Sequence, residues 1–183
     1  MSIRLTLAWV AALIPAMSHA CPPFQYSEAA ASALHAVQKS AGLSGTNFEI
    51  RASERVLNAK ALICDGSRYV LVNEQFLSDL GWTNEHWNWR DVGILAREIG
   101  RHVMGHVVYR GERHREELSA DRYAGEVLFR LGASLNQALA MIDVLPEEMS
   151  SSHPKKSERA AAVSEGWSRA GAATDRPGGP TPR

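Results

Sequence analysis

The stretch from Trp87 to Tyr109 constrains the fold of this chain most strongly, because its apolar residues recur at the period of an α-helix. Apolar side chains at steps of three and four residues lie in one stripe along a helix. The members of this stripe are Val92, Leu95, Ala96, Ile99, Val103 and Val107. Arg97 and Arg101 project from roughly the opposite side, where further apolar residues flank them. Such a helix is typical of the buried centre of a domain, with its polar pair facing an internal cleft.

Composition limits the size of the domain and the class of partner. The 183 residues are enough for one domain and too few for two. The 20 basic and 20 acidic side chains give a formal net charge of zero. A chain without a basic field is not expected to bind nucleic acid or an anionic membrane surface.

Residues 1–20 have the pattern of a signal peptide. Arg4 precedes an apolar run over residues 5–16, and Ser18-His19-Ala20 forms a small-x-small cleavage site. The run is too short for a membrane anchor, and no other segment is long and apolar enough to span a bilayer. We expect a mature chain that begins at Cys21 and is exported to the periplasm or secreted. A lipoprotein is the alternative, although Ser18 stands where lipoprotein signals prefer a leucine-like residue.

The chain contains two cysteines, Cys21 and Cys64. An exported protein meets an oxidising environment, and an even number of cysteines there favours pairing. We therefore predict a disulfide between the mature N-terminus and the segment around Cys64. Two unpaired thiols are the alternative, and neither cysteine has a second cysteine nearby with which to bind a metal.

The rest of the chain predicts a mostly helical α+β domain over residues 21–170 with a small antiparallel sheet. The expected helices span residues 28–40, 74–80, 115–131, 135–144 and 157–170, with Ser27, Ser134 and Ser157 as N-caps. Strands are expected at residues 47–52, 61–64 and 68–73, the last two joined by an Asp65-Gly66 turn. Trp82, Trp87 and Trp89 are expected to pack the first turn of the central helix. Residues 171–183 have too little apolar surface to fold and are expected to be disordered.

Four segments of the chain follow one another in an order and at spacings that are specific. They read ILAREIGRHVMGH, EELSADRYAG, LGASLNQALAMI and SHPKKSERAAAV. The first resembles the active-site helix of peptidases with the motif His-Glu-x-x-His. The second resembles the Glu-x-x-x-Asp helix that follows it in the family of the CAAX prenyl protease and its soluble bacterial relatives. The third and fourth resemble the next helix and the His-Pro segment of that family, and RYVLVNEQFL extends the resemblance upstream. The resemblance implies a zincin-like fold with a central active-site helix.

The resemblance also implies roles for four residues by position. A catalytic zinc ion has three protein ligands and one water, whose pKa it lowers toward neutrality. Glu98 would be the general base and Glu117 the third zinc ligand. Asp121 would orient that ligand, and His153 would lie near the substrate. The alternatives are a solvated acidic face for Glu117 and Asp121 and an ordinary loop position for His153.

Arg97 and Arg101 stand where this family has its two zinc-binding histidines. A guanidinium group stays protonated and has no lone pair to offer a metal. We hypothesise that the two guanidiniums occupy the cation site and pair with Glu98, Glu117 and Asp121. No buried carboxylate would then lack a counter-charge, and on this hypothesis no cofactor is expected.

A relocated zinc site is the alternative. Glu98, His102 and His106 follow one another at i, i+4 and i+8, and two histidines at this spacing can chelate zinc. His114 lies nearby in the sequence. The peptidases that the chain resembles often have histidines at the positions of His102 and His106 as well, so these residues need no new role.

Two classes of function follow. The first is a catalytically inactive pseudopeptidase that keeps the cleft and binds a peptide or a partner protein, with Arg68–Asn73 as an exposed edge strand for an extended ligand. The second is an active zinc-dependent metalloendopeptidase with a non-standard metal site. A metal-free hydrolase is not favoured, because the sequence contains no apparent Ser-His-Asp or Cys-His arrangement.

Overall fold

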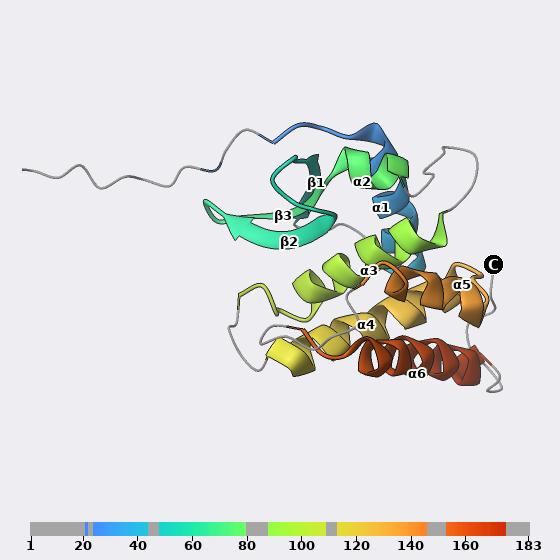
Figure 1. Ribbon diagram of the computed structural model, residues 1–183. Helices are drawn as coiled ribbons and strands as arrows, with labels where there is room; N and C mark the ends of the chain where they lie inside the picture. The colour runs from blue at the N-terminus through green and yellow to red at the C-terminus, as the bar shows by residue number, and fades with distance from the viewer. Residues whose placement is uncertain are drawn as a thin grey trace, which may run out of the picture.

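The computed structural model describes residues 21, 24–43, 48–79, 88–108, 113–145 and 153–174. These residues form a mostly helical α+β fold. The helices are α1 (Glu28–Ser40), α2 (Glu74–Asp79), α3 (Trp89–Val103), α4 (Arg113–Arg130), α5 (Leu135–Leu139), the 3₁₀ turn η1 (Ala140–Ile142) and α6 (Lys156–Thr174), and the strands are β1 (Phe48–Ala52), β2 (Ala59–Cys64) and β3 (Ser67–Val72). In Figure 1, α3 lies between the sheet above and α4 and α6 below. The predicted signal peptide, Trp82 and Trp87 lie outside the described residues.

The sheet is mixed, which corrects the predicted antiparallel sheet. β2 and β3 form the expected hairpin, and φ is 48° at Asp65 and 77° at Gly66, as a tight two-residue turn requires. β1 pairs with β3 in parallel, with Ile50 opposite Val70. β3 therefore lies between β1 and β2. The Asp65-Gly66 turn reveals the β2–β3 hairpin in the sequence. No local sequence pattern reveals that β1 pairs with β3 in parallel.

The segment before α1 crosses one face of the sheet. Its contacts are the Cys21–Cys64 disulfide on β2, the Phe24–Tyr69 ring contact on β3 and the Gln25–Ala52 bridge on β1. Because successive side chains of a strand alternate between faces, Tyr69 points away from the buried side of β3, which Val70 marks with 0% exposure. The disulfide confirms the predicted cysteine pairing. This segment therefore covers the face of the sheet that α1 and α3 leave open.

Helix α3 is buried around most of its circumference, which confirms the central helix. It is shorter than the predicted stretch of residues 87–109. The side chain of Asn88 caps the first turn, and the helix ends at Val103. Gly105 has a φ of 75° and turns the chain away. The buried stripe ends before this turn, because Val103, a predicted member of it, is 47% exposed, and Val108 beyond the turn is 58% exposed.

Helices α4 and α6 cross in direct backbone contact at two glycines. A Cβ atom on Gly125 would lie 2.1 Å from the carbonyl oxygen of Val163, and one on Gly166 would lie 1.8 Å from that of Arg122. Real Cβ atoms do not approach oxygen so closely, so both positions require glycine. The close crossing lets side chains of α6 reach the buried face of α4.

The last helix is longer than predicted. α6 includes Ser157, which was expected to cap it, and continues through Gly171 to Thr174. The helix therefore ends four residues beyond residue 170, where its end was expected. Residues 175–183 lie outside the described residues. Ser134 forms the expected N-cap, but the helix that it begins is short and passes into a 3₁₀ turn.

Candidate functional site

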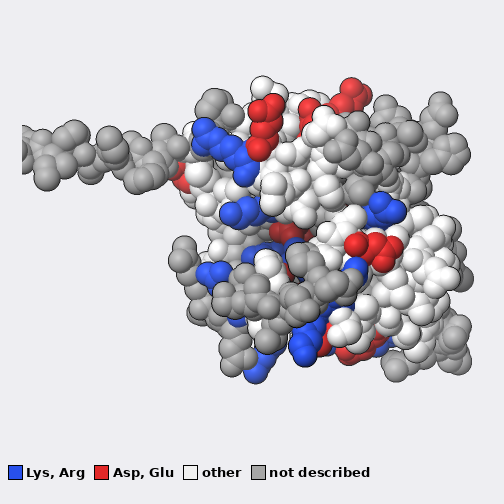
Figure 2. All heavy atoms as spheres, in the orientation of Figure 1, with Lys and Arg blue, Asp and Glu red and all other residues white. Residues whose placement is uncertain are grey.

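The charged residues of α3 meet the acidic residues of α4 beneath the sheet. Arg97, Glu98 and Arg101 come from α3, and Glu117 and Asp121 come from α4. The three acidic residues are 2%, 4% and 0% exposed, in sequence order. Figure 2 shows acidic and basic atoms together in the middle of this face, between the sheet and the lower helices. Buried charges of both signs are thus concentrated at one place.

Arg97 contacts three different carboxylates through one guanidinium group. Its Nη1 donates to Glu98, its Nη2 to Glu117, and its Nε to Oδ1 of Asp121 at 3.1 Å. Burial lowers the pKa of Arg97, while the negative charges of Glu98 and Asp121 raise it. Arginine nevertheless stays protonated at neutral pH. A single cation therefore joins the three buried carboxylates.

Arg159 of α6 completes the network, and the sequence analysis missed it. Its Nε and Nη2 donate to the two oxygens of Asp121 at 2.7 and 2.8 Å, the bidentate geometry of a strong charge-assisted pair. Arg159 is 4% exposed. The sequence contained a signal, because Val163 and Gly166 follow Arg159 on the same buried face at helical spacing. A charge among such residues requires a partner.

The carboxylate of Glu117 receives contacts from three directions. Arg101 donates to Oε1, Arg97 donates to Oε2, and Nδ1 of His153 lies 3.3 Å from Oε2. Burial lowers the pKa of His153, and the positive charges of Arg97, Arg159 and Arg101 lower it further. The imidazole is therefore neutral at neutral pH. The three guanidiniums then balance the three carboxylates.

Both oxygens of Glu98 accept hydrogen bonds from the protein. Oε1 accepts from Arg97, and Oε2 accepts from the backbone amide of Ala61 in β2 at 2.7 Å. Nε of Arg101 also lies 3.7 Å from Oε2. A general base must present an oxygen to the water that it deprotonates. Glu98 instead connects α3 to the sheet through its hydrogen bond with the amide of Ala61. No sequence pattern predicts this contact, because its donor is a backbone amide.

The side chains at the zinc-ligand positions of the resembling family do not fit zinc. Arg97 and Arg101 carry only hydrogen-bond donors, and both point at Glu117, the third of these positions. A catalytic zinc site needs three protein ligands that have lone pairs. Here a single position of the three supplies one, so these residues do not support a metal-dependent step.

His102 has a structural environment. Its Nε2 lies 2.9 Å from the carbonyl oxygen of Tyr69, and its ring stacks on Phe48 with the centroids 5.2 Å apart. Burial lowers its pKa, so the ring is neutral and can donate to that carbonyl. This histidine therefore joins α3 to β1 and β3.

His106 does not continue the polar stripe of Glu98 and His102. The proposed i, i+4, i+8 arrangement is wrong because α3 ends at Val103. Nε2 of His106 lies 3.4 Å from Oγ of Ser119 on α4. In the part of the chain that the structure describes, Glu98, His102 and His106 do not bring ligand atoms within 4.8 Å of one another.

Asp91, in the first turn of α3, is a buried carboxylate of another kind that the sequence analysis missed. It is 0% exposed, and neither of its oxygens has a hydrogen-bond partner in the part of the chain that the structure describes. Burial raises its pKa to about 7, against the opposing effect of Arg90. Asp91 lies two turns before Glu98 on nearly the same side of the helix. The sequence did contain a signal for this buried carboxylate, because Asp91 directly precedes Val92 of the apolar stripe.

Comparisons of the chain with protein-family models, with curated proteins and with solved structures found no match. The function therefore has to be argued from the geometry of this network and from its surroundings.

Proposed function

We propose that this chain is a non-catalytic descendant of an HExxH zinc peptidase, a pseudopeptidase that binds a peptide or a partner protein. The position of Arg97 carries the proposal, because its guanidinium contacts Glu98, Glu117 and Asp121 at once. In the family that the chain resembles, carboxylates at these positions surround the zinc site. A cation that belongs to the chain provides the positive charge here.

The charge balance supports this proposal. Loss of both zinc-binding histidines would remove the zinc ion and leave buried carboxylates without a counter-charge, and an uncompensated buried charge costs about 3–5 kcal/mol. Arginine at both positions, together with Arg159, restores one cation for each carboxylate. Such an exchange keeps the shape of the domain while it removes the metal ligands. A domain that keeps its shape in this way is suited to binding.

The outer edge of β2, which pairs with no other strand among the described residues, is the surface that we propose for the ligand. It replaces the predicted edge at Arg68–Asn73, which belongs to the central strand β3. The two-residue turn sets the alternation of the hairpin, so the amides of Ala61 and Ile63 point outward. The amide of Ala61 agrees with this direction and already donates to Glu98, so the amide of Ile63 is the one that we propose for the ligand. An extended peptide pairs with such an edge through main-chain hydrogen bonds.

We place the protein outside the cytoplasm. The predicted signal peptide motivates this proposal, and the Cys21–Cys64 disulfide supports it, because such bonds persist in oxidising compartments. Among the described helices, none has the length and apolar character needed to cross a membrane.

Catalysis is tested on the purified mature protein. Its metal content is measured by elemental analysis after dialysis without chelator, and hydrolysis of a fluorescent casein substrate is followed with and without added zinc. We expect no bound stoichiometric metal and no hydrolysis in either condition. Hydrolysis that a chelator abolishes would overturn the proposal.

Binding is tested with peptides selected from a phage-displayed random library. The Ile63→Pro variant removes an outward amide on the edge of β2, and Ile63→Val is the matched control that keeps it. We expect Ile63→Pro to weaken selected peptides by about ten-fold or more, equivalent to about 1.4 kcal/mol, and Ile63→Val to leave them unchanged. Equal binding to both variants would place the ligand on another surface.

A further inference from the structure

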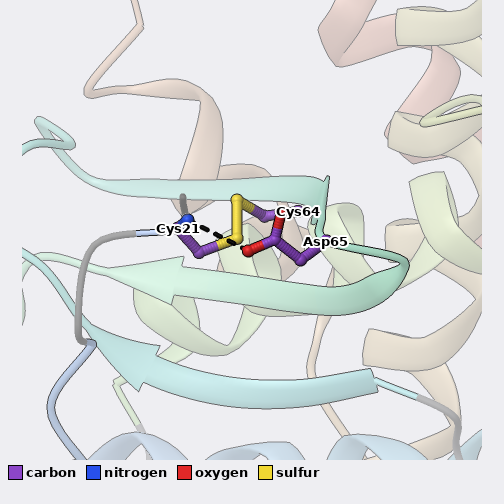
Figure 3. Close-up of side chains that lie close together, drawn as sticks. All are labelled: Cys21, Cys64 and Asp65. Atoms are coloured by element: carbon purple, nitrogen blue, oxygen red, sulfur yellow. Dashed lines mark hydrogen bonds between the residues drawn. A yellow bond between two sulfur atoms is a disulfide. The ribbon is translucent and has the colours of Figure 1, made fainter. Parts of the chain in front are cut away.

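The backbone nitrogen of Cys21 donates a hydrogen bond to Oδ2 of Asp65 at 3.1 Å. Figure 3 shows this contact beside the disulfide that joins Cys21 to Cys64, at the turn between β2 and β3. The two sulfurs and a carboxylate oxygen lie within 4.8 Å of one another, the one such grouping among the described residues. Because the sulfurs are bonded to each other, they are not available to a metal. The carboxylate of Asp65 needs another explanation.

The turn does not by itself require an acidic residue at position 65. A φ of 48° favours glycine, asparagine or aspartate, and asparagine before Gly66 forms this turn equally well. Aspartate adds a negative charge on an exposed side chain. A carboxylate binds an ammonium group more strongly than it binds a neutral amide. The charge therefore points to a cationic partner at the nitrogen of Cys21.

We propose that Asp65 binds the α-ammonium group of the mature chain. The small-x-small pattern of residues 18–20 places cleavage after Ala20. Hydrolysis of the Ala20–Cys21 bond adds one water molecule, leaving a carboxylate on Ala20 and an ammonium group on Cys21. The nitrogen that becomes charged is the one that already donates to Asp65. Cleavage thus converts a hydrogen bond from a neutral amide to a carboxylate into an ion pair between the same two groups.

The same geometry decides between the two fates of Cys21. A lipoprotein carries its lipid through a thioether bond to the sulfur of this cysteine. In the structure that sulfur is bonded to Cys64, and one sulfur atom cannot form both bonds. The exported chain is therefore not lipidated at Cys21, and its amino group stays free to bind Asp65.

The ion pair fixes the end of the segment that crosses the sheet. Beyond Cys21, Phe24 packs against Tyr69 with ring centroids 5.1 Å apart, and Gln25 pairs with Ala52. A terminus held by a covalent bond and by a charge keeps these contacts in place. A free terminus would fray. Removal of the leader thus locks the segment across all three strands.

The test measures the pKa of the α-amino group in the mature chain that begins at Cys21. Reductive methylation with ¹³C-formaldehyde labels this amine, and its NMR signal is titrated with the disulfide intact. We expect Asp65 to raise the α-amino pKa by about one unit above its value in the Asp65→Asn variant. Asparagine keeps the turn and the hydrogen-bond acceptor but removes the charge. A chain that retains Ala20 is the second control, because its Cys21 nitrogen is a neutral amide.

Three results would overturn the proposal. An α-amino pKa that is equal in the mature chain and in Asp65→Asn would show that no ion pair forms. A mass of the exported protein that includes a lipid on Cys21 would contradict the free amino group. An exported chain that begins at a residue other than Cys21 would remove the ammonium from this position. Far-UV circular dichroism establishes that each variant is folded before its titration is interpreted.

Discussion

Asp121 and Arg122 are neighbours on α4, and each forms an ion pair with α6, but the two pairs lie in opposite environments. Asp121 and Arg159 have side-chain exposures of 0% and 5%, and Arg97 contacts the same carboxylate. Arg122 and Glu165 are 34% and 49% exposed, although their atoms approach to 2.8 Å. Water and salt screen the exposed pair. The buried charge of Asp121 is instead compensated by protein side chains, the guanidiniums of Arg159 and Arg97.

Asp91 provides a third environment for a titratable group, which is burial without a hydrogen-bond partner among the described residues. Its carboxyl group is 0% exposed, as that of Asp121 is. Burial raises the pKa of Asp91 to about 7, whereas guanidiniums contact both oxygens of Asp121. The comparison teaches that partners, rather than depth, allow a buried carboxylate to remain charged.

The largest effect is expected from Asp121→Asn. This variant keeps the shape of the side chain but leaves Arg159 and part of Arg97 without a counter-charge. We expect the free energy of unfolding to fall by about 3–5 kcal/mol, the range for breaking a buried ion pair. Urea denaturation followed by circular dichroism measures it. A loss below about 1 kcal/mol would mean that the buried network behaves like a surface pair.

The double variant Arg97→His/Arg101→His tests whether the side chains of this network stand at positions from which they could bind a metal ion. Two imidazoles at i and i+4 would join Glu117, which already points into the site, and these three groups suit zinc. We expect zinc at 100 times its dissociation constant to raise the free energy of unfolding by about 2.7 kcal/mol. Thermal unfolding with zinc and with magnesium measures the effect, and Arg97→Lys/Arg101→Lys is the control. An unchanged melting temperature with zinc would contradict the proposed ancestry.

The local elements of the fold could be predicted from the sequence because their signals are local. Ser27 and Ser134 cap their helices, and Asp65-Gly66 forms the predicted hairpin. The period of the apolar residues identified α3 as the central helix. The expectation that Arg97 would meet Glu117 came from the register of the resemblance, since the two residues lie on different helices.

The long-range parts of the fold and of the site could not be predicted in the same way. The parallel pairing of β1 with β3 joins segments whose own patterns are neutral about direction. The end of α3 depends on the positive φ of Gly105. The apolar pattern continues at Val107 and Val108 beyond this glycine, so the sequence did not show that the helix ends there. The bond from Ala61 to Glu98 uses a backbone amide, which every residue except proline has. Arg159 reaches Asp121 only because α4 and α6 cross at glycines.

Asp91→Asn sharpens the comparison in the opposite direction, because it should stabilise the protein at alkaline pH. The ordinary pKa of 3.8 rises to about 7 in the folded protein, and one pKa unit corresponds to about 1.4 kcal/mol. The side-chain amide of the introduced asparagine would also be buried in this pocket without hydrogen-bond partners, and this cost offsets part of the gain. The net gain in the free energy of unfolding at pH 8 should therefore be about 2 kcal/mol.

The pH dependence gives the sign of this effect. At pH values below 3.8, Asp91 is protonated in both states, so its carboxyl group carries no ionisation penalty. Between 3.8 and about 7, the unfolded chain has lost this proton while the folded chain retains it, so stability falls as the pH rises. The gain from Asp91→Asn should grow across this window and stay constant above it. Urea denaturation at pH 4, 6 and 8 measures it, and a gain that is equal at all three values would exclude Asp91 as the cause.

The smallest effect is expected from Glu165→Gln, which breaks the exposed pair between the same two helices. Arg122 remains in contact with water, so we expect a loss of about 0.5 kcal/mol or less in the free energy of unfolding. The loss should vanish in 1 M salt, where charges are screened within about 3 Å. The loss from Asp121→Asn should persist there, because salt does not enter the buried site. Equal losses in the two variants would show that the contact between α4 and α6, rather than the burial of charge, sets the cost, and the distinction between the two ion pairs would then fail.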